Sequence, residues 1–411
     1  MNLEYFIAKR LTTAKNHKSS VSSPIIKIAT IAIAISIVMM IISVATGLGL
    51  QNKIREKISA FNGQIIISNF DDNQSQINTI PISTKQSFYP EFKSVSGIKH
   101  IQAVANKTGL IRTAETVEGV IFKGVGTDYD WNNINEYLVQ GSIPKLSESK
   151  YTDEVLISQY LANRLNLKLS DVCRTFFLKE GGKGYNLRSF KVAGIFNSGF
   201  QEFDANYIIG DIKHIQKINK WKLDEVGQFE IFIQDFSKIE QKATEIYKEI
   251  PPTLNSVSIA EKYYSIFEWL KLFDLNIVII LIIMIVVATI NMIVALLVLI
   301  LERTQMIGIL KSLGANNWNI RKIFLYNAFH LIIKGLFFGN IIAIALIFLQ
   351  KEFSIIKLDP ESYYVTTAPI DFNILFIILL NIGTIIICLL VLIVPSYIIT
   401  KISPVKAMRF D

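Results

Sequence analysis

Long apolar blocks alternate with polar segments along this chain of 411 residues. A bilayer core of about 30 Å requires roughly 20 apolar residues in a helix, and four blocks are long enough. They are residues 28–50, 275–301, 326–350 and 372–399, the last with Pro395 near its end. The pattern predicts four transmembrane helices, with a large polar region at 51–271 between the first and the second.

The first apolar block is interpreted as a retained membrane anchor. Its apolar run is longer than the core of about 7–15 residues that a cleaved signal peptide carries. A basic segment, residues 1–27, also precedes it. The chain therefore begins with a short polar segment followed by a permanent span.

The polar region has the texture of a mixed α/β domain. Runs rich in β-branched and aromatic residues predict strands, and they lie at 63–70, 119–126, 189–196 and 229–235. Helical patterns cover 154–165 and 236–250, the second ending before two prolines that stop a helix. The residues after the first span and before the second stay in helical register. We therefore expect two stalk helices that carry an α/β domain on the membrane helices.

The distribution of lysine and arginine predicts the orientation. Basic residues gather in segments 1–27, 302–325 and 400–411, whereas the loop at 351–371 is acidic. The positive-inside rule places these three basic segments in the cytoplasm and the polar region and the acidic loop outside. The formal net charge of +8 thus reflects membrane topology and does not indicate nucleic acid. The apolar residues of the N-terminal segment share one helical face, as in a helix lying along the membrane interface: Leu3, Phe6, Ile7 and Leu11.

Motifs of enzymatic chemistry are missing from the sequence. The glycines and lysine of residues 180–185 lack the spacing of a phosphate-binding loop, so we expect no nucleotide to bind this chain. The acidic pairs Asp128–Asp130 and Glu202–Asp204 are typical of solvated turns. The histidines are too far apart to predict a metal site: His17, His100, His214 and His330. A non-catalytic membrane subunit is the resulting prediction.

The loop after the second span carries the clearest functional signal. Its pattern predicts a short amphipathic helix at 306–313, ended by Gly314 as a C-terminal cap, and a second helix starting at Asn316 or Asn317. Ile307, Leu310 and Leu313 can share one face of the short helix. Such a helix projecting from a membrane domain is a natural docking element for a cytoplasmic partner.

This segment resembles the coupling helix of the MacB/FtsX/LolC-type ABC transporter permeases, with the pattern E-R-x-x-E-I-G-[IV]-L-[KR]-[AS]-L-G-A. Met306 stands where the family has a glutamate. The chain's ending resembles the family's as well, through Pro404, Ala407 and Arg409. The resemblance implies a cytoplasmic ABC ATPase dimer that binds ATP and Mg²⁺, and a second permease, in a homodimer or a heterodimer. The matching positions are Glu302, Arg303, Ile307, Gly308, Ile309, Leu310, Lys311, Ser312, Leu313, Gly314 and Ala315.

The segment "GIFNSGFQEFDANYIIGDI" at 194–212 resembles the lipoprotein-releasing permeases LolC and LolE. The matching residues are Gly194, Phe196, Ser198, Gly199, Glu202, Phe203 and Asp204. Two further stretches, at 122–128 and 155–171, are similar to the same family. This resemblance implies a bacterial inner-membrane permease subunit that extracts lipoproteins from the outer leaflet for a LolA-like periplasmic carrier.

The same resemblance places two further sites. A loop that hooks the carrier corresponds to residues 179–188, which here are glycine-rich and basic and lack the family's proline and apolar residues; its positions are Lys179, Gly181, Gly182, Tyr185 and Arg188. A lipid cavity is expected beside the first two spans, where Met39, Met40 and Val44 line it or face lipid. Two alternatives stay open: a MacB-like exporter, and an FtsX-like signalling protein that activates a cell-wall hydrolase.

Overall fold

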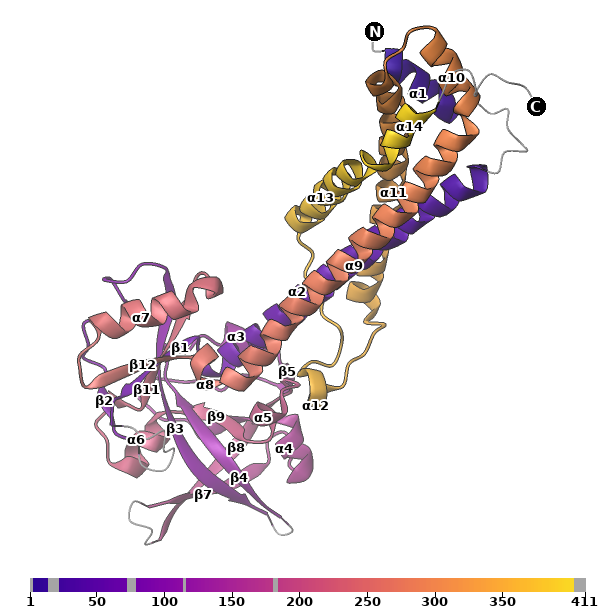
Figure 1. Cartoon of the computed structure of the whole chain (residues 1–411). Coiled ribbons are helices and arrows are strands. Elements are labelled where there is room, and N and C mark those ends of the chain that lie inside the picture. The colour runs from indigo at the N-terminus through magenta and orange to yellow at the C-terminus, as the bar shows by residue number, and fades with distance from the viewer. Residues whose placement is uncertain (1–2, 14–21, 72–78, 114–115, 180–183, 403–411) are drawn as a thin grey trace. The chain divides into compact units, whose positions relative to one another are not determined.

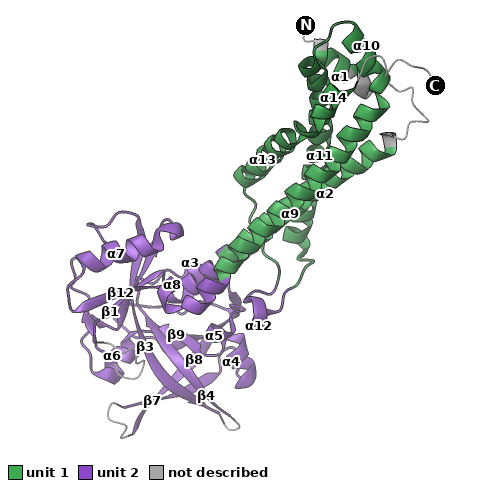
Figure 2. Ribbon diagram, in the orientation of Figure 1, with its two compact units in different colours: residues 1–51, 270–357, 367–411 green, residues 52–269, 358–366 purple. Residues whose placement is uncertain are grey.

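The computed structural model describes residues 3–13, 22–71, 79–113, 116–179 and 184–402 (Figure 1). The chain forms two compact units (Figure 2). Unit 1 comprises residues 1–51, 270–357 and 367–411, and unit 2 comprises residues 52–269 and 358–366. The chain therefore passes between the units four times: after residue 51, after residue 269, and twice within the segment at 357–367.

Unit 1 is built around four helices that are long and apolar enough to cross a membrane. Three of them contain a predicted span: α2 (Ser22–Asn62), α9 (Tyr264–Glu302) and α11 (Asn317–Phe353). The fourth, α13 (Ile374–Leu392), covers most of the predicted block at 372–399. Both α2 and α9 continue past the boundary of unit 1, as expected for stalk helices. Pro395 interrupts the fourth apolar segment, which ends in the turn η3 (Pro395–Tyr397) and in α14 (Ile398–Lys401). Two short helices complete the unit, α1 (Leu3–Thr13) and α10 (Thr304–Ser312).

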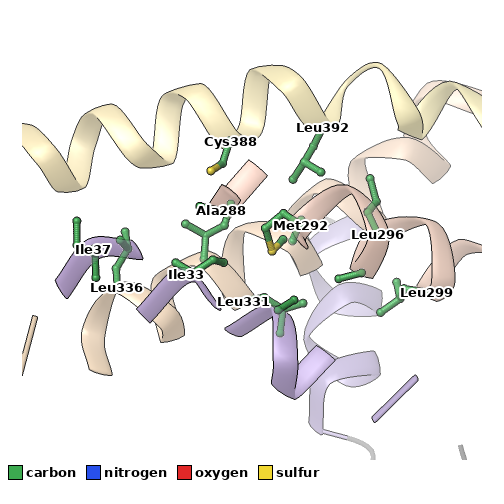
Figure 3. Packing of buried hydrophobic residues seen from close by; sticks show 14 of the residues in the cluster. Ile33, Ile37, Ala288, Met292, Leu296, Leu299, Leu331, Leu336, Cys388 and Leu392 are labelled. Carbon is green, nitrogen blue, oxygen red and sulfur yellow. The ribbon is translucent and has the colours of Figure 1, made fainter. Parts of the chain in front are cut away.

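Close packing of α2 on α11 depends on two glycines one turn apart. A Cβ at Gly335 would lie 2.7 Å from Ile33 Cγ2, and one at Gly339 would lie 2.8 Å from the carbonyl oxygen of Ala34. Small residues at this spacing let two helix backbones approach closely in a membrane. Figure 3 shows the surrounding apolar cluster, to which α9 and α13 also contribute.

A pair of amides joins α11 to α13. Asn340 Nδ2 donates to Asn381 Oδ1 at 2.7 Å, and Asn381 Nδ2 donates to Asn340 Oδ1 at 3.0 Å. Each amide thereby satisfies the other inside an apolar segment, where an unpaired polar group is costly.

Unit 2 is a mixed α/β domain around a ten-stranded sheet in the order β12-β1-β11-β3-β4-β9-β6-β8-β5, with β7 paired to β3 and β8. Its strands are β1 (Ile65–Asn69), β3 (Ile98–Arg112), β4 (Val117–Val125), β5 (Leu138–Gly141), β6 (Glu154–Ser158), β7 (Val172–Leu178), β8 (Tyr185–Phe196), β9 (Tyr207–Asp211), β11 (Gln228–Ile233) and β12 (Leu254–Ser258). A separate two-stranded sheet pairs β2 (Ile82–Ser83) with β10 (Glu225–Val226). The helices are α3 (Asn132–Asn135), α4 (Gln159–Arg164), α5 (Gln201–Asp204), α6 (Lys213–Asn219), η2 (Phe236–Lys238), α7 (Ile239–Glu249), α8 (Ile259–Lys262) and α12 (Pro360–Tyr363).

The four predicted strands are confirmed as β1, β4, β8 and β11, and the second predicted helix as α7 with η2 before it. The helix predicted at 154–165 is wrong in its first half, which forms the buried strand β6. A short apolar run fits a buried strand and a helix equally well. The helix begins only at Gln159, after Ser158, whose hydroxyl accepts a hydrogen bond from Leu161 N as an N-terminal cap.

The loop between α11 and α13 is divided between the units. Residues 358–366, which include α12, belong to unit 2. Leu358 N donates to Thr366 O at 3.0 Å and closes this short excursion. From the sequence, the segment at 351–371 is predicted only to connect two spans. The structure shows that part of it belongs to the α/β domain.

Candidate functional site

The predicted docking helix is present as α10. Gly314 follows it with a φ of +88°, in the left-handed region that favours glycine. Ala315 N then donates to Leu310 O at 2.9 Å, which caps the helix end. The next helix, α11, begins at Asn317, as predicted.

The two faces of α10 differ from the expectation. Ile307 is fully buried and Leu310 is half-buried, and both pack on the apolar cluster of unit 1. Leu313, in contrast, is 78% exposed, so the three residues do not form one exposed surface. The exposed apolar pair is Ile309 and Leu313, which lie four residues apart and thus on one side of the helix.

Lys311 fastens α10 to the end of α14. Its Nζ donates to Ile399 O and to Ile402 O, both at 2.7 Å. A lysine can satisfy the last carbonyl groups of a helix in this way. The ammonium group is therefore directed at this chain's own backbone, which no local sequence pattern indicates.

The other residues of the coupling motif lie around α10. Glu302 is exposed, Arg303 and Ala315 are half-buried, and Gly308 is buried. The matching residues of the C-terminal tail, Pro404, Ala407 and Arg409, lie outside the described residues.

The candidate cavity residues on α2 point in different directions. Met40 is fully buried in the apolar cluster of unit 1, whereas Met39 is 44% exposed. Val44 is nearly buried and lies on the same side as Met40. The structure therefore does not bring Met39 and Met40 together on one surface of this chain.

The candidate hook is the hairpin between β7 and β8. Its register is fixed by backbone pairing from Val172–Lys191 to Leu178–Tyr185, and Lys179 N donates to Gly184 O. Tyr185 is exposed and contacts Phe176 edge-on at 5.1 Å, and Arg188 is half-buried on β8. Gly181 and Gly182 lie outside the described residues.

The LolC/LolE-like segment builds a tight turn around a buried carboxylate. Asp204 accepts hydrogen bonds from Ser198 N at 3.0 Å, from Ser198 Oγ at 2.7 Å and from Gly199 N at 3.0 Å. Gly199 adopts a φ of +64°. Burial raises the pKa of Asp204 despite these bonds. The expectation of a solvated pair is therefore wrong for Asp204, whereas Glu202 beside it is exposed.

The same segment supplies aromatic rings that hold the end of α2. Phe61, in its last turn, stacks on Phe203 at 4.8 Å and lies 5.5 Å from Phe196. Gly194 permits the close approach of its strand, since a Cβ there would lie 2.7 Å from Ser142 O. The segment at 194–204 thus forms a seat for the end of a stalk helix.

A buried ion pair holds the backbone of the same helix end. Lys123 Nζ donates to Phe61 O at 2.6 Å and to Glu230 Oε1 at 2.6 Å, and both charged side chains are 1% exposed. Burial lowers the pKa of Lys123, and the Glu230 carboxylate opposes that shift. The Asn62 Oδ1 atom accepts a hydrogen bond from the hydroxyl of Tyr263 at 3.2 Å, which joins the end of α2 to the start of the second stalk.

Among the residues that the structure describes, no three His, Cys, Asp or Glu side chains are grouped so that they could hold a metal ion. The described residues give unit 1 the short helix α10, and they give unit 2 a helix end held by hydrogen bonds and aromatic contacts.

Comparison with known proteins gives concordant matches. A family model described as FtsX-like permease C-terminal matches residues 278–404, and one described as MacB-like periplasmic core domain matches residues 28–245. The lipoprotein-releasing system transmembrane protein LolC of Buchnera aphidicola subsp. Schizaphis graminum is 24% identical over 403 residues and covers 93% of each chain. The corresponding LolE of Haemophilus influenzae is 20% identical and covers 99% of each chain. The crystal structure of the periplasmic region of MacB from Actinobacillus actinomycetemcomitans matches at 14% identity and a TM-score of 0.34, covering 50% of this chain and 92% of that one.

The family models cover the membrane helices as well as the α/β domain. One model describes a permease, and both relatives are named as transmembrane proteins of a lipoprotein-releasing system. With its four apolar helices and its α/β domain after the first of them, the chain belongs to the MacB/FtsX superfamily of ABC transporter permeases and is LolC/LolE-like.

Proposed function

We propose that this chain is the permease subunit of an ATP-driven transporter that extracts lipoproteins from the outer leaflet of the bacterial inner membrane and delivers them to a periplasmic carrier. The relatives named for lipoprotein release align with it over nearly their full length. The observation that carries the mechanical part of the proposal is the exposed apolar pair on α10, Ile309 and Leu313.

The exposed pair is the proposed contact with a cytoplasmic ABC ATPase dimer, which binds ATP and Mg²⁺. An amphipathic helix that presents apolar anchors suits a groove on a partner. Lys311 ties α10 to α14 from inside the chain. A push on Leu313 would therefore be passed to the membrane helices and not absorbed by a loose loop.

The substrate part of the proposal follows from the cost of removing acyl chains from a bilayer. Each buried CH₂ group is worth about 0.8 kcal/mol, so a lipoprotein with several chains needs external work to leave. In this proposal ATP hydrolysis in the partner supplies that work, and a second permease, identical or different, completes the path. The basic ends of the chain are cytoplasmic, and unit 2 is periplasmic. The β7–β8 hairpin, with Tyr185 exposed and Arg188 half-buried, is the proposed contact for a LolA-like carrier.

Copurification tests the docking step. We expect the double variant Ile309→Asp/Leu313→Asp to lose the ATPase, because two charges replace the apolar anchors. Leu223→Asp is the matched control, since Leu223 is 81% exposed in unit 2 and far along the chain from α10. Retention of the ATPase by the double variant, with wild-type abundance, would refute the docking surface.

Reconstitution tests the transport step. Proteoliposomes that contain the complex and a triacylated lipoprotein should release it to a soluble carrier only when ATP is added. Hydrolysis without release, in the presence of the carrier, would contradict lipoprotein extraction and favour a signalling role.

A further inference from the structure

Three stretches of chain connect unit 2 to unit 1. Each contributes one aromatic ring to a series of five rings in which each ring contacts the next. The first stretch is α2, which carries Phe61. The second is the start of α9, which carries Trp269. The third is the loop between α11 and α13, which carries Tyr364.

The series runs through stacked rings of the segment at 194–204. Phe61 stacks on Phe203 at 4.8 Å, Phe203 on Phe200 at 4.7 Å, and Phe200 on Tyr364 at 4.7 Å. Tyr364 then meets Trp269 edge-on at 5.7 Å. Both arrangements are favourable for aromatic pairs. All five rings belong to unit 2.

Tyr364 adopts an unusual backbone conformation. Its φ is +59°, a left-handed value that is a true outlier for a bulky residue. Such strain persists only where the surroundings determine it. Here the Lys57 Nζ atom, on α2, donates to Tyr364 O at 3.1 Å, and Tyr364 N donates to Pro360 O at 3.0 Å. Val365, the next residue, is 3% exposed.

The turn around Asp204 completes the seat for this loop. A Cβ at Gly199 would lie 3.1 Å from Lys57 Nζ and 3.7 Å from Thr366 Cγ2, so the glycine leaves room for both. Asp204 fixes Ser198 and Gly199 directly before Phe200. The turn therefore aims the Phe200 ring at the loop between two membrane helices.

We propose that Tyr364 is a coupling residue that makes the α11–α13 loop a third mechanical attachment of the α/β domain, beside the two stalk helices. The stacked rings make the loop move together with the end of α2 and the start of α9. A displacement of α11 or α13 is thereby passed to the α/β domain. This inference rests on the proposed transport function, in which ATP hydrolysis must be converted into movement of that domain.

The variant Tyr364→Gly tests the inference without straining the loop, because glycine adopts positive φ readily. In the complete complex with its ATPase, we expect nearly unchanged ATP hydrolysis. Lipoprotein release per ATP should fall by about tenfold, the scale of a typical coupling between sites. Tyr364→Phe keeps the ring and should behave as wild type. Tyr247→Ala is the control, because Tyr247 is 51% exposed on α7 and is not one of the five rings.

A second measurement does not depend on the substrate. Spin labels at Leu223→Cys in unit 2 and Phe353→Cys at the end of α11 can be introduced selectively, since both native cysteines are buried. We expect ATP with vanadate to change the distance between the labels, and Tyr364→Gly to abolish most of that change.

The outcomes separate the two proposals. A distance change in the wild type without lipoprotein release would overturn the proposed substrate and leave the coupling role supported. An unaltered distance change, or full release per ATP, in Tyr364→Gly would overturn the coupling role. Loss of ATP hydrolysis together with release in that variant would also count against it, because the ring would then serve folding.

Discussion

The buried pair of Lys123 and Glu230 offers a quantitative test of how the stalk is anchored. We consider the substitution Lys123→Met, which keeps the length of the side chain and removes its charge. Glu230 keeps two amide donors, Gln102 at 2.8 Å and Gln228 at 3.4 Å, but loses its ion-pair partner. The carbonyl oxygen of Phe61 loses the ammonium group that donates to it at 2.6 Å.

The expected cost follows from these contacts. Removing one member of a buried ion pair costs about 3–5 kcal/mol, because the other charge stays buried without compensation. A carbonyl deprived of its donor costs about 1–3 kcal/mol, although the two effects overlap. We therefore expect Lys123→Met to lower the free energy of unfolding by about 4 kcal/mol. The double variant Lys123→Met/Glu230→Met should recover most of it, because it leaves no unpaired charge.

Urea unfolding of the full-length protein in detergent, followed by tryptophan fluorescence, measures these values. Three of the four tryptophans, Trp131, Trp221 and Trp269, lie in unit 2 and report on the α/β domain. Lys85→Met is the matched control, since its pair with Asp224 has side chains that are 82% and 33% exposed. We expect a much smaller change for that pair, because exposed ion pairs contribute little to stability. A Lys123→Met cost as small as the control, or a double variant no better than the single one, would refute the reasoning.

Two further predictions concern the two units separately. Burial lowers the pKa of His214 below its ordinary 6.5, so below that pH the unfolded chain binds more protons than the folded one. The α/β domain should lose stability as the pH falls through and below 6.5, and His214→Gln should flatten this dependence in urea titrations. In unit 1, Gly339→Leu should destabilise the α2–α11 contact by about 1–3 kcal/mol, seen as a lower melting temperature in detergent. Gly383→Leu is its control, because a Cβ at Gly383 meets no atom within 4 Å, and equal effects of both changes would contradict the packing account.

The membrane helices were the most predictable part of the molecule, because the thickness of a bilayer sets the length of each apolar block. The predicted end of the docking helix was also recovered, since Gly314 is a local signal with a local cause. The direction of its side chains was not predictable. Whether Leu310 or Ile309 faces outward depends on the packing of α10 against helices that are distant in sequence.

The contacts that hold the α11–α13 loop on the α/β domain could not be predicted from the sequence for a similar reason. Tyr364 lies in a segment whose only apparent role is to join two spans. Its partners, Phe200 and Lys57, come from different parts of the chain. The prediction for Asp204 was wrong because an acidic residue near a glycine usually lies in a solvated turn. Here three hydrogen-bond donors of the same turn satisfy the buried carboxylate.

The strand β11 was predicted correctly, but the environment of its polar face was not. Its alternation of apolar and polar residues predicts one face toward the core and one toward water. In the structure Glu230, on the polar face, is 1% exposed, because the end of α2 covers it. Gly63, which follows α2 with a φ of +70°, leaves only 2.7 Å between its hypothetical Cβ and Glu230 Cβ. The polar face of this strand is therefore a charged seat for a helix end, and Glu230 lies there because Lys123 must hold a carbonyl of that helix.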